Sequence, residues 1–161
     1  MKTRVTCGAL WRSGLALVLT AMALPAWAQG AAVCDGSATQ ARLMVRITGI
    51  ESQKGNLTIT VYPDDADRFL AKGGKLSRQR VPVAMPLTAT CFTLPSAGSY
   101  AVAVYHDAND DHDFNRTFVG MPDEGYGFSN NPVTKLGLPG FKEVRFAAKA
   151  GDNPVYIKLT Y

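Results

Sequence analysis

Residues 41–48 read ARLMVRIT, and their pattern decides the class of fold. Leu43, Val45 and Ile47 occupy every second position and two arginines lie between them, which predicts a strand with one buried face. Residues 57–62, LTITVY, repeat this alternation after a polar turn. The two segments are therefore expected to pair as a β-hairpin.

Other stretches of the chain also have strand character. Residues 99–106, SYAVAVYH, are apolar on both faces, as expected for a central strand that is covered on both sides. Further strands are expected at residues 81–84, 88–94, 143–148 and 155–161, the first of them at a sheet edge because prolines remove ladder donors. The basic residues 75–80 predict either a solvated connection or a contact with an anion.

One short helical turn is expected at residues 64–70, capped by Asp64 or Asp65 and ended by two glycines. The long stretch 107–140, rich in Asp, Asn, Gly and Pro, predicts an ordered loop. Together the segments predict an all-β fold: a single antiparallel β-sandwich of the Ig-like or transthyretin-like Greek-key type.

The N-terminus has the pattern of an export signal. Basic residues precede a short apolar run, and small residues at 26 and 28 predict cleavage between Ala28 and Gln29. The alternative is a membrane anchor that is retained. The expected organisation is a signal peptide at 1–28, an N-terminal lead at 29–40 and a β-sandwich domain at 41–161, in a periplasmic or secreted protein without a transmembrane segment after signal removal.

Charge and cysteine content add two expectations. Removing Lys2, Arg4 and Arg12 with the signal lowers the net charge from +4 to +1, so charge gives no argument for nucleic-acid binding. The cysteines that remain are Cys34 and Cys91, and a pair in an oxidising compartment predicts a disulfide bond, with two buried free thiols as the alternative.

The start of the long loop has the oxygen spacing of a calcium site. The side chains at its positions 1, 3, 5 and 7 are Asp107, Asn109, Asp111 and Asp113. His112 stands where the sharp turn of an EF-hand needs Gly, and position 12 lacks the closing Glu. Asp123 or Glu124 is the candidate for the missing ligand.

Two alternatives stay open for this loop. Its Asp and Asn side chains are also typical of a polar turn held by side-chain to backbone hydrogen bonds. The two histidines of the chain, His106 and His112, flank the loop and with the acids predict a zinc or copper site.

Three runs in this region resemble the bacterial family called domain of unknown function 2141. They are YHDANDDHDFN at 105–115, FVGMP at 118–122 and EGYGFSNN at 124–131. The resemblance extends over residues 43–159, although Asp111-His112 replaces the Asn-Gly type of step that members often have. It implies a small periplasmic or secreted β-sandwich and brings no assigned reaction.

The last of these runs is a second candidate surface. Its glycines allow positive φ or close backbone approach, and its aromatic residues can dock the loop onto the sandwich. The candidate surface residues are His106, Tyr126, Phe128, Ser129, Asn130 and Asn131. The alternative is a purely structural lock.

The catalytic motifs G-x-S-x-G, H-E-x-x-H and the P-loop are missing from the sequence. Ser129 with His106 and an Asp is a candidate for a hydrolytic triad, although nothing in the sequence places the three together. The sequence therefore predicts a non-enzymatic binding or envelope accessory module with a calcium-stabilised loop, whose partner is an unknown envelope protein, peptide or glycan. The alternatives are a purely structural envelope protein without a ligand and a metal-dependent hydrolase.

Overall fold

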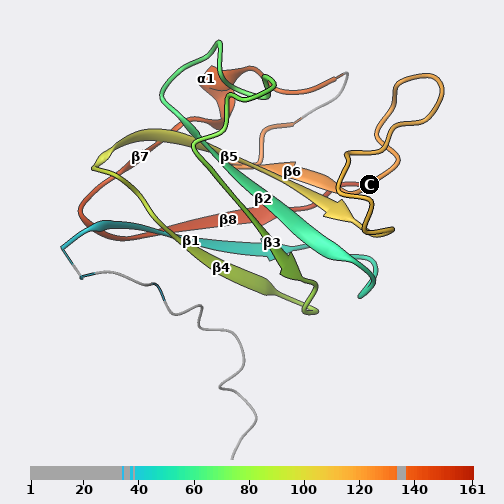
Figure 1. Cartoon of the computed structure of the whole chain (residues 1–161), viewed down its shortest axis with the longest axis horizontal. Helices are drawn as coiled ribbons and strands as arrows, with labels where there is room; N and C mark the ends of the chain where they lie inside the picture. The colour runs from blue at the N-terminus through green and yellow to red at the C-terminus, as the bar shows by residue number, and fades with distance from the viewer. Residues whose placement is uncertain (1–33, 35–36, 38, 134–136) are drawn as a thin grey trace, which may run out of the picture.

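The structure is a computed structural model that describes residues 34, 37, 39–133 and 137–161. The predicted signal peptide and its predicted cleavage site between Ala28 and Gln29 lie outside the described residues. The elements in chain order are β1 (Ala41–Thr48), β2 (Asn56–Pro63), β3 (Ser77–Pro82), β4 (Thr88–Thr93), β5 (Gly98–Asp107), β6 (Tyr126–Phe128), α1 (Phe141–Val144), β7 (Phe146–Ala148) and β8 (Gly151–Lys158) (Figure 1).

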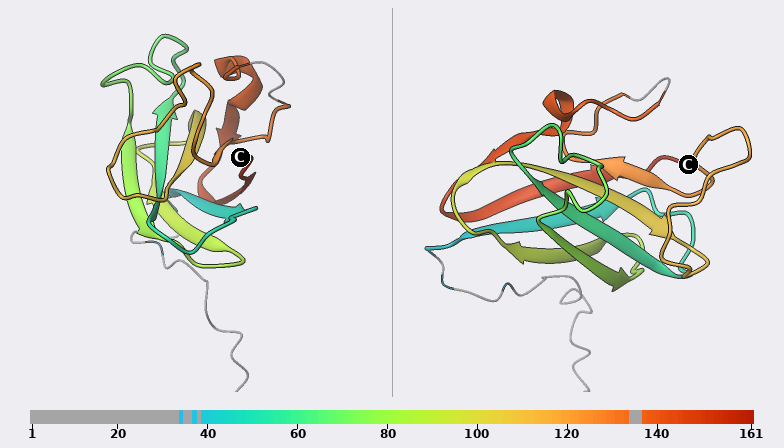
Figure 2. Two further views of the ribbon diagram at one scale, coloured as in Figure 1. Left: turned by 90° about the vertical axis from the view of Figure 1, so that its right-hand side faces the viewer. Right: turned by 45° about the horizontal axis from the view of Figure 1, so that its top comes forward.

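The strands form two open sheets that pack face to face (Figure 2). The three-stranded sheet has the order β4-β1-β8, and the five-stranded sheet has the order β3-β2-β5-β6, with β7 pairing to the other half of β5. Fully or almost fully buried side chains from both sheets, such as Val45, Ile59, Val104 and Ile157, form one core between them. The all-β prediction is confirmed, and β5 is a central strand as expected.

The predicted β-hairpin is wrong. β1 has the expected bounds, but it pairs with β4 and β8, whereas β2 pairs with β3 and β5 in the other sheet. The connection between β1 and β2 crosses from one sheet to the other. Alternation shows that each strand has a buried face, and in a sandwich both sheets supply such a face, so the pattern does not reveal the pairing partner.

The purely antiparallel arrangement is also wrong, because β1 and β8 run parallel, with Val45 opposite Val155. β8 begins at Gly151 rather than at residue 155, and it contains Pro154. β8 is an edge strand of its sheet, where a proline is tolerated since its missing N–H need not serve a neighbour. The Ig-like or transthyretin-like Greek key stays a prediction.

Local elements differ from expectation in four places. Residues 64–70 form turns rather than a helix, although Asp65 accepts the backbone N–H groups of Asp67 and Arg68 as a cap would. An α-helix, α1, lies at the start of the segment 143–148, where a strand was expected. β3 covers most of the predicted basic connection and does lie at a sheet edge, and β6 is a short strand inside the predicted loop.

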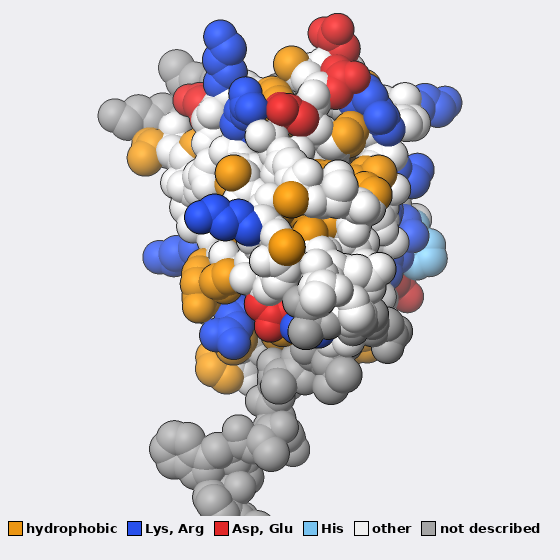
Figure 3. Space-filling view, turned by 90° about the vertical axis from the view of Figure 1, so that its left-hand side faces the viewer, with side chains coloured by type: hydrophobic (Ala, Val, Ile, Leu, Met, Phe, Trp, Pro, Cys, Tyr) orange, Lys and Arg blue, Asp and Glu red, His pale blue; other side chains and the backbone are white. Residues whose placement is uncertain are grey.

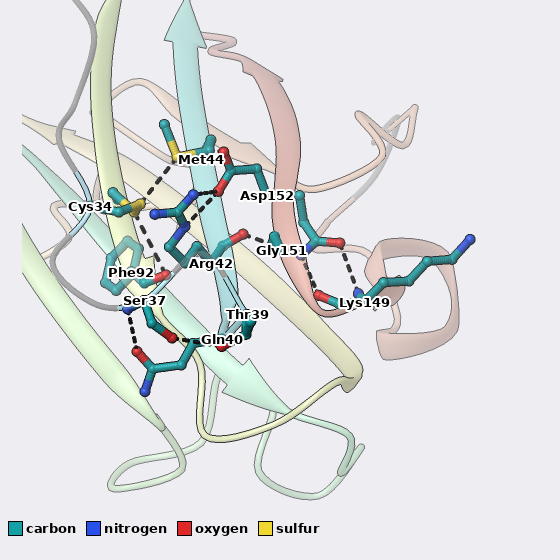
Figure 4. A network of polar contacts seen from close by, with 12 residues as sticks. Cys34, Ser37, Thr39, Gln40, Arg42, Met44, Phe92, Lys149, Gly151 and Asp152 are labelled. Atoms are coloured by element: carbon teal, nitrogen blue, oxygen red, sulfur yellow. Dashed lines mark hydrogen bonds and ion pairs between the residues drawn. A yellow bond between two sulfur atoms is a disulfide. The ribbon is translucent and has the colours of Figure 1, made fainter.

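A disulfide bond joins Cys34 to Cys91, which confirms the predicted pair; their Cα atoms are 5.3 Å apart. Close to it, the Arg42 guanidinium lies 2.6 Å from the Asp152 carboxylate, and the Gly151 N–H donates to the Gln40 carbonyl (Figure 4). The disulfide therefore fixes the segment before β1 to β4, while the ion pair and backbone bond fix β1 to β8.

The surface at the left-hand end of Figure 1 has mixed chemistry. Figure 3 shows Lys and Arg side chains spread over it, with hydrophobic side chains scattered between them. None of the helices in the described part of the chain combines the length and the apolar character needed to cross a bilayer. The segment that follows β5, residues 107–125, lies at the opposite, right-hand end (Figure 1).

Candidate functional site

The acidic loop, residues 107–125, follows β5 at the end of the sandwich where residue 161 also lies (Figure 1). Asp107 ends β5 opposite Asn56, and its side chain is fully buried. Its Oδ1 accepts the backbone N–H of Asp111 (3.1 Å), and its Oδ2 accepts that of His112 (2.9 Å). Backbone N–H groups stabilise a carboxylate, so these bonds wrap the loop around Asp107.

The sharp turn of the loop forms without glycine. Asp110 and His112 both have left-handed backbone conformations, with φ of 62° and 69°. Asp and His are among the non-glycine residues most often found there, although at an energetic cost. The departure from the EF-hand pattern at His112 therefore does not prevent the turn.

Asp111 is the centre of the hydrogen bonding within the loop. Its Oδ1 accepts the N–H of Asp113 (2.8 Å), and its Oδ2 accepts side-chain N–H groups from Asn115 (3.0 Å) and Asn109 (2.8 Å). The Asp113 bond, followed by the two amide bonds, lowers the pKa of Asp111 below its ordinary value. These are the bonds that a polar turn requires, and they hold Asp111 in its charged form at neutral pH.

Glu124 brings a further carboxylate to the loop. It is buried, and its Oε2 accepts the backbone N–H of Asn115 (3.1 Å). Burial raises the pKa of Glu124, and the negative charges of Asp107 and Asp111 raise it further, against the lowering effect of backbone hydrogen bonds. Asp123 is exposed instead. Of the two candidates for the closing ligand, Glu124 is the one whose charge interacts with Asp107 and Asp111.

Asp107 also belongs to a second group of side chains that could ligate a metal ion. One donor atom each from Asp107, Asp110 and His112 lies within 4.8 Å of the others. The Asn56 side-chain amide donates to Asp110 Oδ1 at 2.6 Å, and His112 Nε2 lies 3.4 Å from the same oxygen. The alternating spacing missed Asp110, which the left-handed turn brings close to Asp107. Asn56 was missed as well, because only the register of β2 and β5 places it here.

His106 does not face the acidic loop. Its ring is 1% exposed, with Nε2 2.8 Å from the Lys54 carbonyl and Nδ1 2.7 Å from the Tyr161 hydroxyl. Since a carbonyl only accepts, Nε2 carries the proton, and in the neutral ring Nδ1 accepts from Tyr161. Of the two histidines in the predicted zinc or copper site, only His112 therefore lies with the acids.

Ser129 and His106 are not brought together as nucleophile and base. The Ser129 hydroxyl is fully buried, donates to the Val144 carbonyl (2.6 Å) and accepts the Val102 N–H (2.9 Å). Both ring nitrogens of His106 have the other partners described above. The structure thus does not assemble the triad that the sequence allowed.

The end of the run 124–131 ties separate strands together. The Asn131 amide donates to the Tyr156 carbonyl and accepts the Lys158 N–H, both at 2.8 Å, so it pairs with the edge of β8. The Asn130 amide donates to two carbonyls at the end of α1, those of Glu143 and of the C-cap residue Arg145. These contacts match the predicted structural lock.

The glycine and aromatic residues of this run are closely packed against neighbouring residues. A Cβ on Gly127 would lie 2.9 Å from the Lys158 carbonyl, and one on Gly125 would overlap the Tyr161 ring. Phe128 is buried, whereas Tyr126 is half-buried. Among the predicted surface residues, Tyr126 is also held by its backbone, which exchanges two hydrogen bonds with Thr160, both 2.9 Å long.

Comparison with known proteins identifies a family. No curated protein and no solved structure matches the chain. The profile of domain of unknown function 2141, described as an uncharacterized protein conserved in bacteria, matches residues 45–156. The matched range covers more than half of the chain, and it contains both the acidic loop and the run 124–131. The chain therefore belongs to this bacterial family.

Proposed function

We propose that this protein is an exported, non-enzymatic binding module of the Ig-like or transthyretin-like sandwich type, whose acidic loop binds calcium. The bound ion orders the loop and lets it present a fixed surface to a protein, peptide or glycan of the cell envelope. The observation that carries the proposal is that the buried carboxylate of Glu124 interacts electrostatically with Asp107 and Asp111. Two of these three carboxylates are buried; burial raises the pKa of Glu124, and repulsion from the negative charges of Asp107 and Asp111 raises it further. A divalent cation would relieve that repulsion.

The ligands follow from the loop positions. Asp107, Asn109 and Asp111 supply side-chain oxygens from positions 1, 3 and 5, and Asp113 stands at position 7, where calcium loops use the main-chain carbonyl. Glu124 closes the site in place of a twelfth-position Glu. Calcium accepts six to eight oxygen ligands in flexible geometry, which suits a loop whose closing ligand comes from further along the chain.

Observations outside the acidic loop support export and a non-enzymatic role. The disulfide between Cys34 and Cys91 is typical of an oxidising compartment, which favours the periplasm or the exterior. Two members of the candidate hydrolytic triad, Ser129 and His106, are buried and hydrogen bonded to other partners. A binding role needs neither of them.

A second candidate has a specific observation in its favour. The cluster of Asp107, Asp110 and His112 combines an imidazole with two carboxylates, a donor set that suits zinc or another transition metal better than calcium. The two sites share Asp107 but differ in the rest, so variants at Glu124 and His112 distinguish them.

The test is thermal unfolding of the oxidised protein from Gln29 onward, in EDTA, in millimolar calcium and in zinc. A cation that binds only the folded state at about one hundred times its Kd stabilises by about 2.7 kcal/mol. We expect calcium to raise Tm, Asp111→Asn to abolish the rise, and Asp67→Asn, an exposed carboxylate outside the loop, to leave it unchanged.

Three results contradict the proposal or part of it. An undiminished calcium response in Asp111→Asn would reject this ligand set. A response to zinc alone that is lost in His112→Ala would favour the second site. If neither ion changes Tm, the loop is a polar turn, and affinity capture from envelope extract with and without chelator then tests the alternative of a purely structural protein.

A further inference from the structure

The outer face of the five-stranded sheet has a hollow of about 210 Å³, called the aromatic groove from here on. Its floor contains Thr60 and Ala103, which pair across β2 and β5. Arg78 pairs with Thr60 on one side, and Phe128 pairs with Ala103 on the other. Two small side chains between two large ones leave a depression in this row of the sheet.

Three aromatic rings line one end of the groove. Tyr105 and Tyr126 pair in the next row of the sheet, and Phe114 reaches them from the acidic loop. The ring centroid of Phe114 lies 5.6 Å from that of Tyr105 and 6.1 Å from that of Tyr126. Because the rings are tilted relative to one another, a planar ligand can contact some of them by stacking on a ring face and others by edge-to-face packing.

Two guanidinium groups also line the groove. Arg78 uses its Nε to donate to the Thr60 hydroxyl (2.9 Å), and Arg116 lies over the Phe114 ring, 5.1 Å from its centroid. Within the described ranges, neither arginine forms an ion pair with a carboxylate, whereas Arg42 and Arg145 do. The groove therefore combines aromatic surface with positive charge that has no acidic counterpart.

We propose that the aromatic groove binds a small aromatic organic anion, a carboxylate or sulfonate on one or two planar rings. The rings of the guest lie against Tyr105, Phe114 and Tyr126, and its acidic group points toward Arg78 and Arg116. Arginine binds carboxylates through paired N–H donors and also stacks on rings, so it suits both parts of such a ligand. The hollow is smaller than the roughly 300–1,000 Å³ of pockets for drug-sized ligands, which limits the guest to this size.

The site is independent of the calcium proposal, but Phe114 and Arg116 belong to the acidic loop. Binding is therefore measured in EDTA and in calcium. The probe is 2-naphthoate, and the control ligand is 2-naphthamide, which has the same shape and no charge. Each is titrated into ¹⁵N-labelled oxidised protein, and the amide signals are followed by NMR. We expect saturable shifts at Ala103 and Tyr126, with 2-naphthoate binding about tenfold more tightly.

Two kinds of variant test separately whether the arginine charges and the space in the aromatic groove are needed for binding. Arg78→Gln and Arg116→Gln are each expected to weaken 2-naphthoate about fivefold or more and to leave 2-naphthamide unchanged. Arg46→Gln is the matched control, because Arg46 lies 5.7 Å from the centroid of Tyr156 on strands of the other sheet. Ala103→Leu fills the floor and is expected to abolish the binding of both compounds.

Several results overturn the proposal. They are equal affinity for the two compounds, an affinity for 2-naphthoate that neither arginine variant changes, shifts centred on Tyr156, and no saturable shift in either buffer. The amide spectrum of each free variant reports whether it is folded. If Ala103→Leu does not fold, the two arginine variants and the pair of probes still decide the outcome.

Discussion

The Nδ1 atom of His106 lies 2.7 Å from the hydroxyl oxygen of Tyr161, and this contact joins the end of β5 to residue 161. The same hydroxyl accepts the backbone N–H of Glu51 (3.2 Å). His106 is directly followed by Asp107, the residue around which the acidic loop is wrapped. The hydrogen bonds of Tyr161 thus position the strand end from which the loop starts.

Tyr161→Phe is expected to lower the free energy of unfolding by about 1–3 kcal/mol, because the buried imidazole loses its partner. Urea unfolding at neutral pH measures the change. The control is Tyr156→Phe, whose exposed hydroxyl makes only a 3.5 Å contact with Arg46 and whose loss should cost under about 0.5 kcal/mol. Equal effects of the two substitutions would show that the His106 contact does not stabilise the fold.

Glu124→Gln is expected to stabilise the protein at neutral pH in EDTA. The pKa of Glu124 is raised above its ordinary value of 4.5 in the folded protein, so the folded state binds a proton more readily than the unfolded chain. The carboxylate therefore lowers the free energy of unfolding as the pH rises from about 4.5 through the folded pKa. The glutamine removes this penalty and can still accept the Asn115 N–H.

A series of urea unfolding curves from pH 4 to pH 7 tests this expectation. The advantage of Glu124→Gln over the wild type should be absent at the acid end and should grow with pH. Asp123→Asn, at the exposed neighbouring carboxylate, should show no such trend. A glutamine variant that is less stable than the wild type at pH 7 would mean that the negative charge of Glu124 stabilises the metal-free loop.

His112→Gly is expected to raise the free energy of unfolding by about 1 kcal/mol in EDTA, since glycine adopts the positive φ of this position without a Cβ penalty. It should keep the calcium response and lose any zinc response. His112→Ala separates the two effects, because it removes the imidazole and keeps the strained backbone. If the glycine and alanine variants are equally stable, the left-handed conformation carries no cost here.

Replacing both Cys34 and Cys91 by serine is expected to lower the free energy of unfolding by about 4 kcal/mol. The two residues are 57 positions apart, and crosslinks that close loops of this length restrict the unfolded chain strongly. Guanidinium unfolding of the oxidised, the reduced and the doubly substituted protein measures the effect. A loss below about 1 kcal/mol in both disulfide-free forms would contradict it.

The sequence predicts individual strands better than their partners. The alternation in residues 41–48 predicts β1 with the bounds that the structure has, because every second side chain is buried. It does not predict that β1 pairs with β8, more than one hundred positions away. β6 and α1 are short, and the contacts that hold them, such as those of Ser129 and Asn130, come from distant parts of the chain.

The same limit applies to the acidic loop. Its oxygen-bearing side chains and the later carboxylate follow from the spacing of Asp and Asn residues. The choice of Glu124 over Asp123 depends on burial, and the approach of Asp110 and Asn56 depends on backbone conformation and strand register. Burial and strand register are not local properties, and the left-handed conformations of Asp110 and His112 occur without the glycine that would indicate them in the sequence.

The parallel pair of β1 and β8 sets the order in which this chain can complete its fold. β1 lies in the middle of its sheet, yet one of its two neighbours is the last strand. A growing chain therefore leaves one side of β1 open until residues 151–158 are available. Pairings of such high contact order are slow to form, typically over milliseconds to seconds for β proteins. Folding thus finishes only after nearly the whole domain has emerged, and a chain cut before β8 would keep an open edge along β1.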